Sequence, residues 1–287
     1  MQILVIGGTG MLGEPVARRL QADGHTVRLL ARSPEKARAQ LGDGFAMAPG
    51  DVEDPESIRR ALDGCEGVHI NLNGGPTMAD YDRIEHRGTA NVAQAAATAG
   101  VSHLTYLAGI SAYPHNAHFP PTAAKLNAIA AIQNTGLPYT VFRAQWFFES
   151  LPLFVKNGQA VLLGRMPNRW HWLAAADYAR MVARAYKTPE AKNQVFDIVG
   201  PEPLSLAEAL ERYHEACLPG TTIRRVPFWE ARLLAFMTGN RTLELTVEKM
   251  RFWDRFEEVA DAEPANRVLG TPEATLTQWL TERQVRS

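Results

Sequence analysis

The sequence is poor in cysteine, with only Cys65 and Cys217 among its 287 residues. The two are far apart and stand in no CxxC or metal-ligand spacing, which argues against a disulfide scaffold and is typical of a reducing compartment. Apolar runs of the ~18 residues that a membrane span needs are also lacking. The N-terminal MQILVIGG has neither a basic segment nor a cleavage site. We therefore predict a cytoplasmic protein with no membrane association.

The sequence has no excess of charge of either sign. Lysine and arginine number 30 against 31 acidic residues, which gives a formal net charge of -1. No long-range field attracts such a chain to a phosphate backbone, so we expect no nucleic-acid partner. The apolar content of 46% over this length is enough for one large domain, or for a domain with a smaller lobe.

The first half of the chain alternates short apolar runs with amphipathic stretches. The runs QILVI, TVRLLA, FAMAPG, GVHINL, SHLTYLAG and PYTVFRA indicate strands, and a helical pattern follows each of the first five. Strands and helices that alternate in this way imply right-handed crossovers and a parallel sheet. We predict an α/β fold, with a doubly wound parallel Rossmann sheet that forms a first domain over residues 1–150.

The pattern weakens after residue 150. Connections that contain proline and glycine separate helices expected to begin near Ala174, Leu206, Phe228 and Thr246. Such a segment cannot extend the sheet much. We predict that residues 151–287 form a small, mainly helical C-terminal substrate lobe that does not fold independently, at the carboxyl edge of the sheet where this fold binds ligands.

The stretch GGTGMLG follows a predicted strand and opens a predicted helix, which is the context that a dinucleotide fingerprint requires. Its glycines satisfy two spacings, Gly8-x-Gly10-x-x-Gly13 and Gly7-x-x-Gly10-x-x-Gly13. Such glycines permit a tight turn, let the pyrophosphate approach and allow close packing, while the helix N-terminus supplies N–H groups to the phosphates. The cofactor-binding residues predicted in this segment are Gly7, Thr9, Gly10, Met11, Leu12 and Gly13.

The end of the second predicted strand bears on the choice of cofactor. NAD-binding chains of this kind place an acid there for the ribose, but the sequence LLARSPEK places Arg32 there. A guanidinium pairs bidentately with a 2′-phosphate, which predicts NADP (NADPH) and makes residues 1–150 an NADP-binding Rossmann domain; the alternative is that Arg32 is a solvated loop residue. Asp51 and Val52, after the third strand, and Asn71, after the fourth, are further predicted cofactor contacts.

Several segments together carry a resemblance to a known family. They are GGTGMLG, LLARSPEKA, GDVEDPESIRRALDGCEGV, GTANVAQAAATAGVSHLTYLAGISA, KLNAIAAIQNTGLPYTVFRAQWFFES and VLGTPEATLTQWL. In order and spacing they resemble the NmrA-like branch of the short-chain dehydrogenase/reductase superfamily over nearly the whole chain. The resemblance implies an NAD(P)-binding Rossmann fold. It leaves the reaction open, because the branch includes both NADPH-dependent reductases and redox-sensing regulators that bind the dinucleotide without turnover.

The resemblance also implies an active site around HFPPTAAKLNA, residues 118–128. In orthodox members a tyrosine lies one helical turn before a lysine, so that both face the nicotinamide. Lys125 matches the lysine, whereas Pro121 occupies the tyrosine position. The family's serine would fall at Ala108 or Gly109, with Ser111 as a displaced candidate. The orthodox triad is therefore missing.

Lys125 is the predicted catalytic residue, which either holds the nicotinamide ribose or donates a proton or hydrogen bond to a carbonyl. Ser111, Tyr113 and His115 are further catalytic candidates, because loops at the carboxyl edge commonly carry function. For Tyr113 and His115 the alternative is an ordinary polar loop residue. We predict no metal site, since His115 and His118 have no convincing third ligand.

Aromatic residues gather in QWFFES and RWHW, and we predict that Trp146, Phe147 and Trp170 bind substrate. An aromatic-lined cleft beside NADPH suits a planar acceptor. Quinone reduction also tolerates the loss of the tyrosine, because solvent can protonate the product oxygens. We therefore predict an NADP(H)-dependent oxidoreductase for a quinone-like or conjugated carbonyl compound. The alternative is a non-catalytic NADP(H)-sensing regulator or scaffold, and a homodimer or a protein partner is left open.

Overall fold

The computed structural model describes residues 1–75 and 77–286 and forms two compact units. The first consists of Met1–Ala144, Ala175–Ile198 and Asp261–Thr271. The second consists of Gln145–Ala174, Val199–Ala260 and Pro272–Ser287. The sequence-based division puts every residue after 150 in the second part of the chain. In the structure, Ala175–Ile198 and Asp261–Thr271 belong to the first unit instead.

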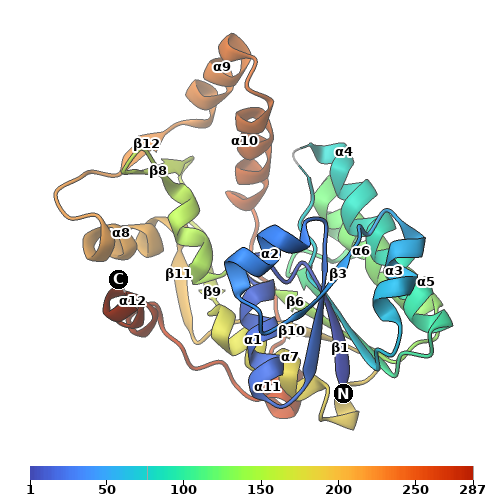
Figure 1. The fold of residues 1–287 in the computed structure, drawn as a ribbon. Helices are drawn as coiled ribbons and strands as arrows, with labels where there is room; N and C mark the ends of the chain where they lie inside the picture. The colour runs from blue at the N-terminus through green and yellow to red at the C-terminus, as the bar shows by residue number, and fades with distance from the viewer. Residues whose placement is uncertain (76, 287) are drawn as a thin grey trace. The chain divides into compact units, whose positions relative to one another are not determined.

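The first unit is built around a parallel sheet of seven strands in the order β10-β6-β5-β4-β1-β2-β3 (Figure 1). In chain order the strands are β1 (Gln2–Ile6), β2 (Thr26–Ala31), β3 (Ala46–Pro49), β4 (Gly67–Ile70), β5 (His103–Gly109), β6 (Tyr139–Ala144) and β10 (Gln194–Ile198). The chain runs from β1 outward to β3 and then returns to β4 on the other side of β1. The strand order therefore reverses between β1 and β4, which is where a doubly wound fold binds its ligand.

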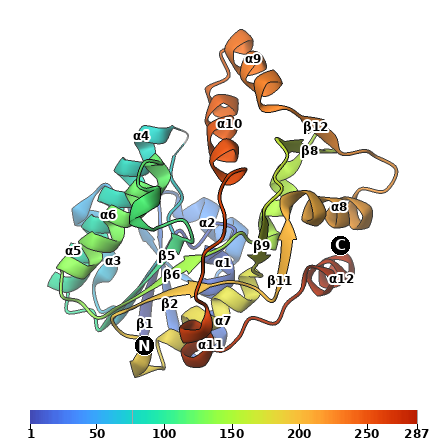
Figure 2. The same ribbon diagram turned by 180° about the vertical axis from the view of Figure 1, so that it is seen from behind.

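Helices cover both faces of this sheet, so the predicted α/β Rossmann architecture is confirmed (Figures 1 and 2). The longer ones are α1 (Gly13–Ala22), α2 (Pro34–Leu41), α3 (Pro55–Leu62), α5 (Thr89–Thr98), α6 (Pro120–Asn134), α7 (Ala175–Ala185) and α11 (Glu263–Leu269). Shorter segments are α4 (Met78–Asp80), the π-helix η1 (Tyr81–Gly88) and the 3₁₀ turns η2 (Pro114–Asn116) and η4 (Pro189–Ala191).

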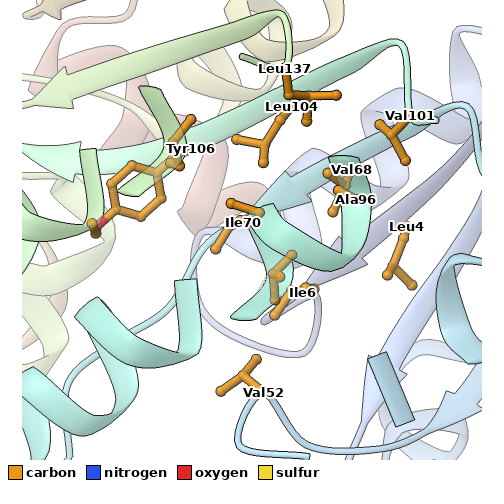
Figure 3. Close-up of a cluster of buried hydrophobic side chains, with 14 of the residues drawn as sticks. Leu4, Ile6, Val52, Val68, Ile70, Ala96, Val101, Leu104, Tyr106 and Leu137 are labelled. Carbon is orange, nitrogen blue, oxygen red and sulfur yellow. The ribbon is translucent and has the colours of Figure 1, made fainter. Parts of the chain in front are cut away.

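The apolar runs form strands because helices cover them on both faces. Residues Ile3–Ile6 of β1 are at most 2% exposed, and Leu104 on β5 is fully buried. Figure 3 shows one cluster of the core, which contains Ile6, Ile70, Leu104, Val52 and neighbouring aliphatic side chains. Tyr106 joins this cluster, and its hydroxyl reaches the functional region described below.

The sequence-based expectation that the chain beyond residue 150 adds little to the sheet missed β10, which pairs in parallel with β6. The usual β–α–β pattern is hidden here, because residues 145–174 of the second unit interrupt the crossover between β6 and α7. The strand itself is only five residues long, QVFDI, and it has a partly exposed start. A short strand after such an interruption gives little periodic signal.

The second unit contains helices and two small sheets. Its helices are α8 (Leu206–Cys217), α9 (Phe228–Thr238), α10 (Arg241–Trp253) and α12 (Leu276–Arg286), with the 3₁₀ segment η3 (Phe148–Phe154). One sheet pairs β9 (Arg169–Trp172) with β11 (Glu202–Ser205), and the other joins β7 (Val155–Lys156), β8 (Gln159–Leu163) and β12 (Arg224–Val226). Helix α10 begins five residues before the predicted Thr246, because the Asn240 side chain caps its N-terminus.

Among the residues that the structure describes, we find no helix with the length and apolar character needed to cross a membrane.

Candidate functional site: a dinucleotide cradle and a lysine–glutamate pair

The glycine loop lies at the point where the strand order reverses. Gly7 follows β1 with φ +76°, and a Cβ on it would lie 2.0 Å from the carbonyl oxygen of Asn71, which follows β4. A Cβ on Gly13 would lie 2.1 Å from the Gly7 carbonyl oxygen. Gly10 is exposed, and the nearest atom to a Cβ there is the Gly7 carbonyl oxygen at 3.2 Å. Two glycines thus permit close packing, and the third leaves the outer side of the loop open.

Helix α1 begins directly behind this loop. No side chain caps its N-terminus at Leu12. In the first turn the Glu14 N–H donates to the Gly10 carbonyl oxygen at 3.0 Å, and Pro15 has no N–H, which leaves the Gly13 N–H available to an anionic ligand. Thr9 and Met11 are exposed at the same end. Gln40 on α2 donates from Nε2 to the Thr9 carbonyl oxygen at 3.0 Å. It also donates to Glu14 at 3.1 Å, which holds the loop against the neighbouring helix.

The predicted adenosine-side residues follow the next strands of the same edge. Arg32, after β2, is exposed, and no hydrogen bond or ion pair holds it within the described part of the chain. Asp51 accepts the backbone N–H of Glu53 at 3.0 Å, which fixes its carboxylate within a local turn. Val52 is buried, and Asn91 donates to its carbonyl oxygen at 3.0 Å. The open Gly10, the uncapped helix and the unpaired guanidinium fit a dinucleotide along this edge.

A largely buried ion pair of the first unit joins Lys125 and Glu85. Helix α6 begins at Pro120, and Lys125 lies in its second turn, with its Cδ 3.7 Å from where a Cβ on Gly109 would be, at the end of β5. The Lys125 ammonium lies 2.9 Å from Glu85 Oε2. Their side chains are 18% and 1% exposed, respectively. The lysine is thus held at the carboxyl edge of the sheet by a buried carboxylate.

Glu85 lies on η1, which packs along α6. The same Oε2 accepts the Tyr106 hydroxyl at 3.2 Å. Burial first, and then the Glu85 charge, raise the pKa of Tyr106 well above its usual value. The same two causes raise the pKa of Tyr81, one turn before Glu85. Both phenols therefore stay protonated at neutral pH, and the buried carboxylate lies between a cation and a phenol donor.

The other catalytic candidates form hydrogen bonds or ring contacts with residues other than Lys125 and Glu85, although the Ser111 Oγ and the Lys125 Cδ both lie within 4 Å of where a Cβ on Gly109 would be. The Ser111 hydroxyl is buried and lies 2.9 Å from the Thr122 hydroxyl. Tyr113 donates to Asp197 Oδ2 at 2.6 Å, and Arg143 binds the other oxygen of that carboxylate at 2.7 Å. Burial, together with the bond to Asp197, raises the pKa of Tyr113 to about 12. His115 is exposed, and its ring stacks on Tyr113.

The predicted substrate aromatics all lie in the second unit. Trp146 is half-buried, and its ring stacks on Trp170 and Phe154 at centroid distances of 5.5 and 5.7 Å. Trp170 is fully buried, and its indole N–H donates to the Phe256 carbonyl oxygen at 3.2 Å. Phe147 is 7% exposed. Of these three predicted residues, Trp146 offers accessible ring surface, while Trp170 supports it from within the core.

The family model described as NAD(P)H-binding matches residues 7–189, which include the glycine loop, Arg32 and the Lys125–Glu85 pair. The chain belongs to this NAD(P)H-binding family. Membership confirms the dinucleotide cofactor class that the glycine loop predicted. The resemblance to NmrA-like oxidoreductases is confirmed by an NmrA-like family domain-containing oxidoreductase of Aspergillus japonicus, 32% identical over 58% of this chain and 52% of its own. Family membership does not distinguish NADP from NAD.

Similar proteins extend the comparison beyond the matched segment. An NAD(P)H azoreductase of Xenophilus azovorans is 28% identical over 288 residues, which are 96% of each chain. A photosystem II assembly factor of Trieres chinensis is 25% identical over 83% of this chain and 76% of its own. The structure of Citrobacter sp. triphenylmethane reductase with NADP(H) superposes with a TM-score of 0.78 at 22% identity, covering 98% and 99% of the two chains.

Two residues of this candidate site were not predicted from the sequence. Glu85 stands 40 residues before Lys125, and no local motif connects them. The sequence around Glu85 shows only a carboxylate within an amphipathic helical stretch, which does not indicate that the side chain is buried. Gln40 is likewise an unremarkable helix residue until α2 packs beside the loop. Both act through contacts between segments, which periodicity does not report.

Proposed function

We propose that this protein is an NADPH-dependent reductase of planar, conjugated aromatic acceptors such as quinones. The observation that carries the proposal is the Lys125 ammonium, which the buried Glu85 holds at the edge of the sheet that also carries the glycine loop. Pro121 stands one turn before it, so the position of the family's tyrosine offers no ionisable group.

In this proposal Gly7, Gly10 and Gly13 admit the pyrophosphate, and the N-terminus of α1 binds it. When bound, the dinucleotide supplies the hydride. Lys125 offers ammonium N–H donors to an acceptor atom that becomes negatively charged, which is the electrostatic role of a positioned donor. Glu85 keeps the ammonium in place and neutralises its charge.

The preference for NADPH over NADH is part of the proposal and rests on Arg32. The guanidinium is exposed at the end of β2, and no acidic residue engages it within residues 1–75 and 77–286. A planar cation with unused donors suits the bidentate recognition of a phosphate monoester.

The acceptor class follows from what the site lacks. A ketone needs a proton delivered to its oxygen as the hydride arrives, a task for which a tyrosine beside a lysine is suited. A quinone, an azo compound or a dye cation spreads the incoming electron pair over a conjugated system, and solvent can protonate the product. The names of the azoreductase and the triphenylmethane reductase indicate conjugated substrates of this type. Trp146 presents a half-buried ring on which a planar compound could stack.

A second candidate function is a non-catalytic assembly or scaffold role. The similarity to the photosystem II assembly factor over 83% of this chain favours it. The substitution of proline at position 121 is compatible with either function. The first experiment must therefore separate cofactor binding from cofactor consumption.

The test is NADPH oxidation by the purified protein against a panel of quinones, azo dyes, a triphenylmethane dye and simple ketones. We expect turnover with the conjugated acceptors that falls sharply in Lys125→Ala, while the affinity for NADPH changes little. Asn127→Ala serves as the matched control, because Asn127 is exposed on the same helix. NADPH binding without oxidation of any acceptor would refute the enzyme and favour the scaffold.

A further inference from the structure

Helix α9 exposes large apolar side chains to an extent not expected of a solvated surface. Trp229 is 69% exposed, Phe236 87% and Met237 73%, and Leu233 and Leu234 are about half exposed at 50% and 52%. The buried side chains of α9 are Ala231 and Ala235, which belong to the face that packs mainly on α10 (Figures 1 and 2). The helix therefore rests on its small residues and presents its large ones outward.

Four of these side chains form one stripe. Trp229, Leu233, Phe236 and Met237 are spaced i, i+4, i+7 and i+8, which places them on a single helical face opposite the two alanines. At roughly 200 Å² for each large apolar side chain, the five exposed residues present on the order of 650 Å². Monomeric proteins seldom expose a contiguous apolar patch larger than this, and such patches mark interaction sites.

Charge near the stripe decides among occupants. Within α9 the two charged residues are Glu230 and Arg232, and Glu230 is paired with Arg224 at 3.1 Å. A helix that lies on an anionic membrane carries a lysine- and arginine-rich polar face, and α9 has one basic residue. Attraction to a strongly charged protein is equally unsupported. An apolar stripe with little net charge is complementary to another apolar, nearly uncharged surface, such as the same stripe on a second copy of the chain.

We propose that α9 is the contact by which two copies of this chain form a homodimer. The five exposed residues present on the order of 650 Å², which is most of the ~800 Å² that each partner buries in an interface of standard size. In a two-fold contact between antiparallel helices the same face serves both copies. Leu233, at the middle of the stripe, lies nearest the axis, and Trp229 packs beside the partner's Phe236. Large aromatic anchors near the centre of an interface carry most of the affinity.

The test is sedimentation velocity at protein concentrations from about 1 to 100 µM. We expect the wild type to sediment at twice the chain mass of 31.7 kDa, and Phe236→Asp to sediment as a monomer over the whole range. Leu153→Asp is the matched control, since Leu153 is also a strongly exposed apolar residue, 63%, of the second unit, and we expect it to remain dimeric. High salt should leave the wild-type dimer intact, because an apolar contact is not screened.

Because Phe236 is 87% exposed, its replacement should not disturb folding, which far-UV circular dichroism verifies. If Phe236→Asp nevertheless unfolds, Met237→Lys on the same stripe replaces it. A wild type that is monomeric at 100 µM overturns the proposal, and so does a dimer that survives both substitutions. A monomer that floats with phosphatidylcholine vesicles would also overturn it and would assign the stripe to lipid.

Discussion

The two ends of the functional edge of the sheet are built on different principles. At the β1 end, backbone geometry makes the site: a Cβ cannot be added at Gly7 or Gly13 without meeting a carbonyl oxygen about 2 Å away. At the β5 end, contacts between side chains make it: Lys125 depends on Glu85 from a separate helix. A site that depends on backbone geometry needs glycines at fixed spacings, which can be recognised in the sequence. A site made of contacts between side chains from separate segments has no such local motif.

The largest expected effect is at the backbone-defined end. Gly13→Ala puts a methyl group 2.1 Å from the Gly7 carbonyl oxygen, so the loop must move. We expect NADPH affinity to fall on the order of 100-fold, the size that a displacement of about 1 Å produces at a positioned site. Calorimetric titration with NADPH measures it. Gly44→Ala is the control, because its nearest neighbour is a flexible glutamine at 3.4 Å; equal losses in both variants would contradict this account.

The next largest effect is expected at the Lys125–Glu85 pair, where variants should change catalytic activity and stability by different amounts. We expect Lys125→Met to lower kcat by about 100-fold or more. It should also lower the free energy of unfolding by roughly 3 kcal/mol, because Glu85 is left as a buried, unpaired carboxylate. The double variant Glu85→Gln, Lys125→Met should regain most of that stability and none of the activity. Denaturant unfolding and steady-state rates together provide the check.

If the double variant were as unstable as the single one, Glu85 would not be the partner that matters. Glu85→Gln alone should keep NADPH affinity and lower kcat by about tenfold, since an amide still accepts a hydrogen bond but no longer pairs with the ammonium charge.

A smaller effect is expected at the end of β2 and tests whether Arg32 binds the 2′-phosphate of NADPH. Arg32→Glu should weaken NADPH binding by about 10- to 100-fold, the range of one or two hydrogen bonds between charged groups. NADH binding should change little. Arg38→Glu, on the following helix, is the matched control. Equal losses for both dinucleotides would show that Arg32 does not select between them.

The last prediction concerns stability alone and comes from β4, which lies between β1 and β5 in the sheet. Burial lowers the pKa of His69 to about 3, and its Nδ1 lies 2.8 Å from the Thr105 hydroxyl. An unfolded histidine takes up a proton near pH 6.5, so stability that is present above that pH is lost as the pH falls toward 3. We expect the free energy of unfolding to drop by about 2 kcal/mol between pH 7 and pH 4.5.

Chemical denaturation over this pH range checks the expectation. His69→Gln should flatten the pH dependence, whereas His115→Gln, an exposed histidine, should leave it unchanged. An unchanged slope in His69→Gln would assign the acid sensitivity to other groups, such as buried His103, whose pKa burial lowers to about 4.

The sequence predicted six of the seven strands of the sheet and the position of the glycine loop, because each is a local pattern of apolar runs and turns. It did not predict β10, whose crossover is interrupted by the second unit. In the site, Lys125 was identified through a family resemblance, and its partner Glu85 was not. The full burial of Trp170 against Trp146 could not be predicted from the sequence either. A run of adjacent aromatic residues does not reveal which of them faces solvent.

The placement of β10 has a consequence for the synthesis of the chain. When residue 150 has left the ribosome, β6 exists but its outer neighbour does not, so its backbone N–H and C=O groups form an unpaired edge beside Val141 and Phe142. Unpaired edges of this kind invite strand addition by other chains. Almost fifty further residues, to Ile198, must therefore be synthesised before β10 covers this edge of β6, and a fragment cut at residue 150 should aggregate.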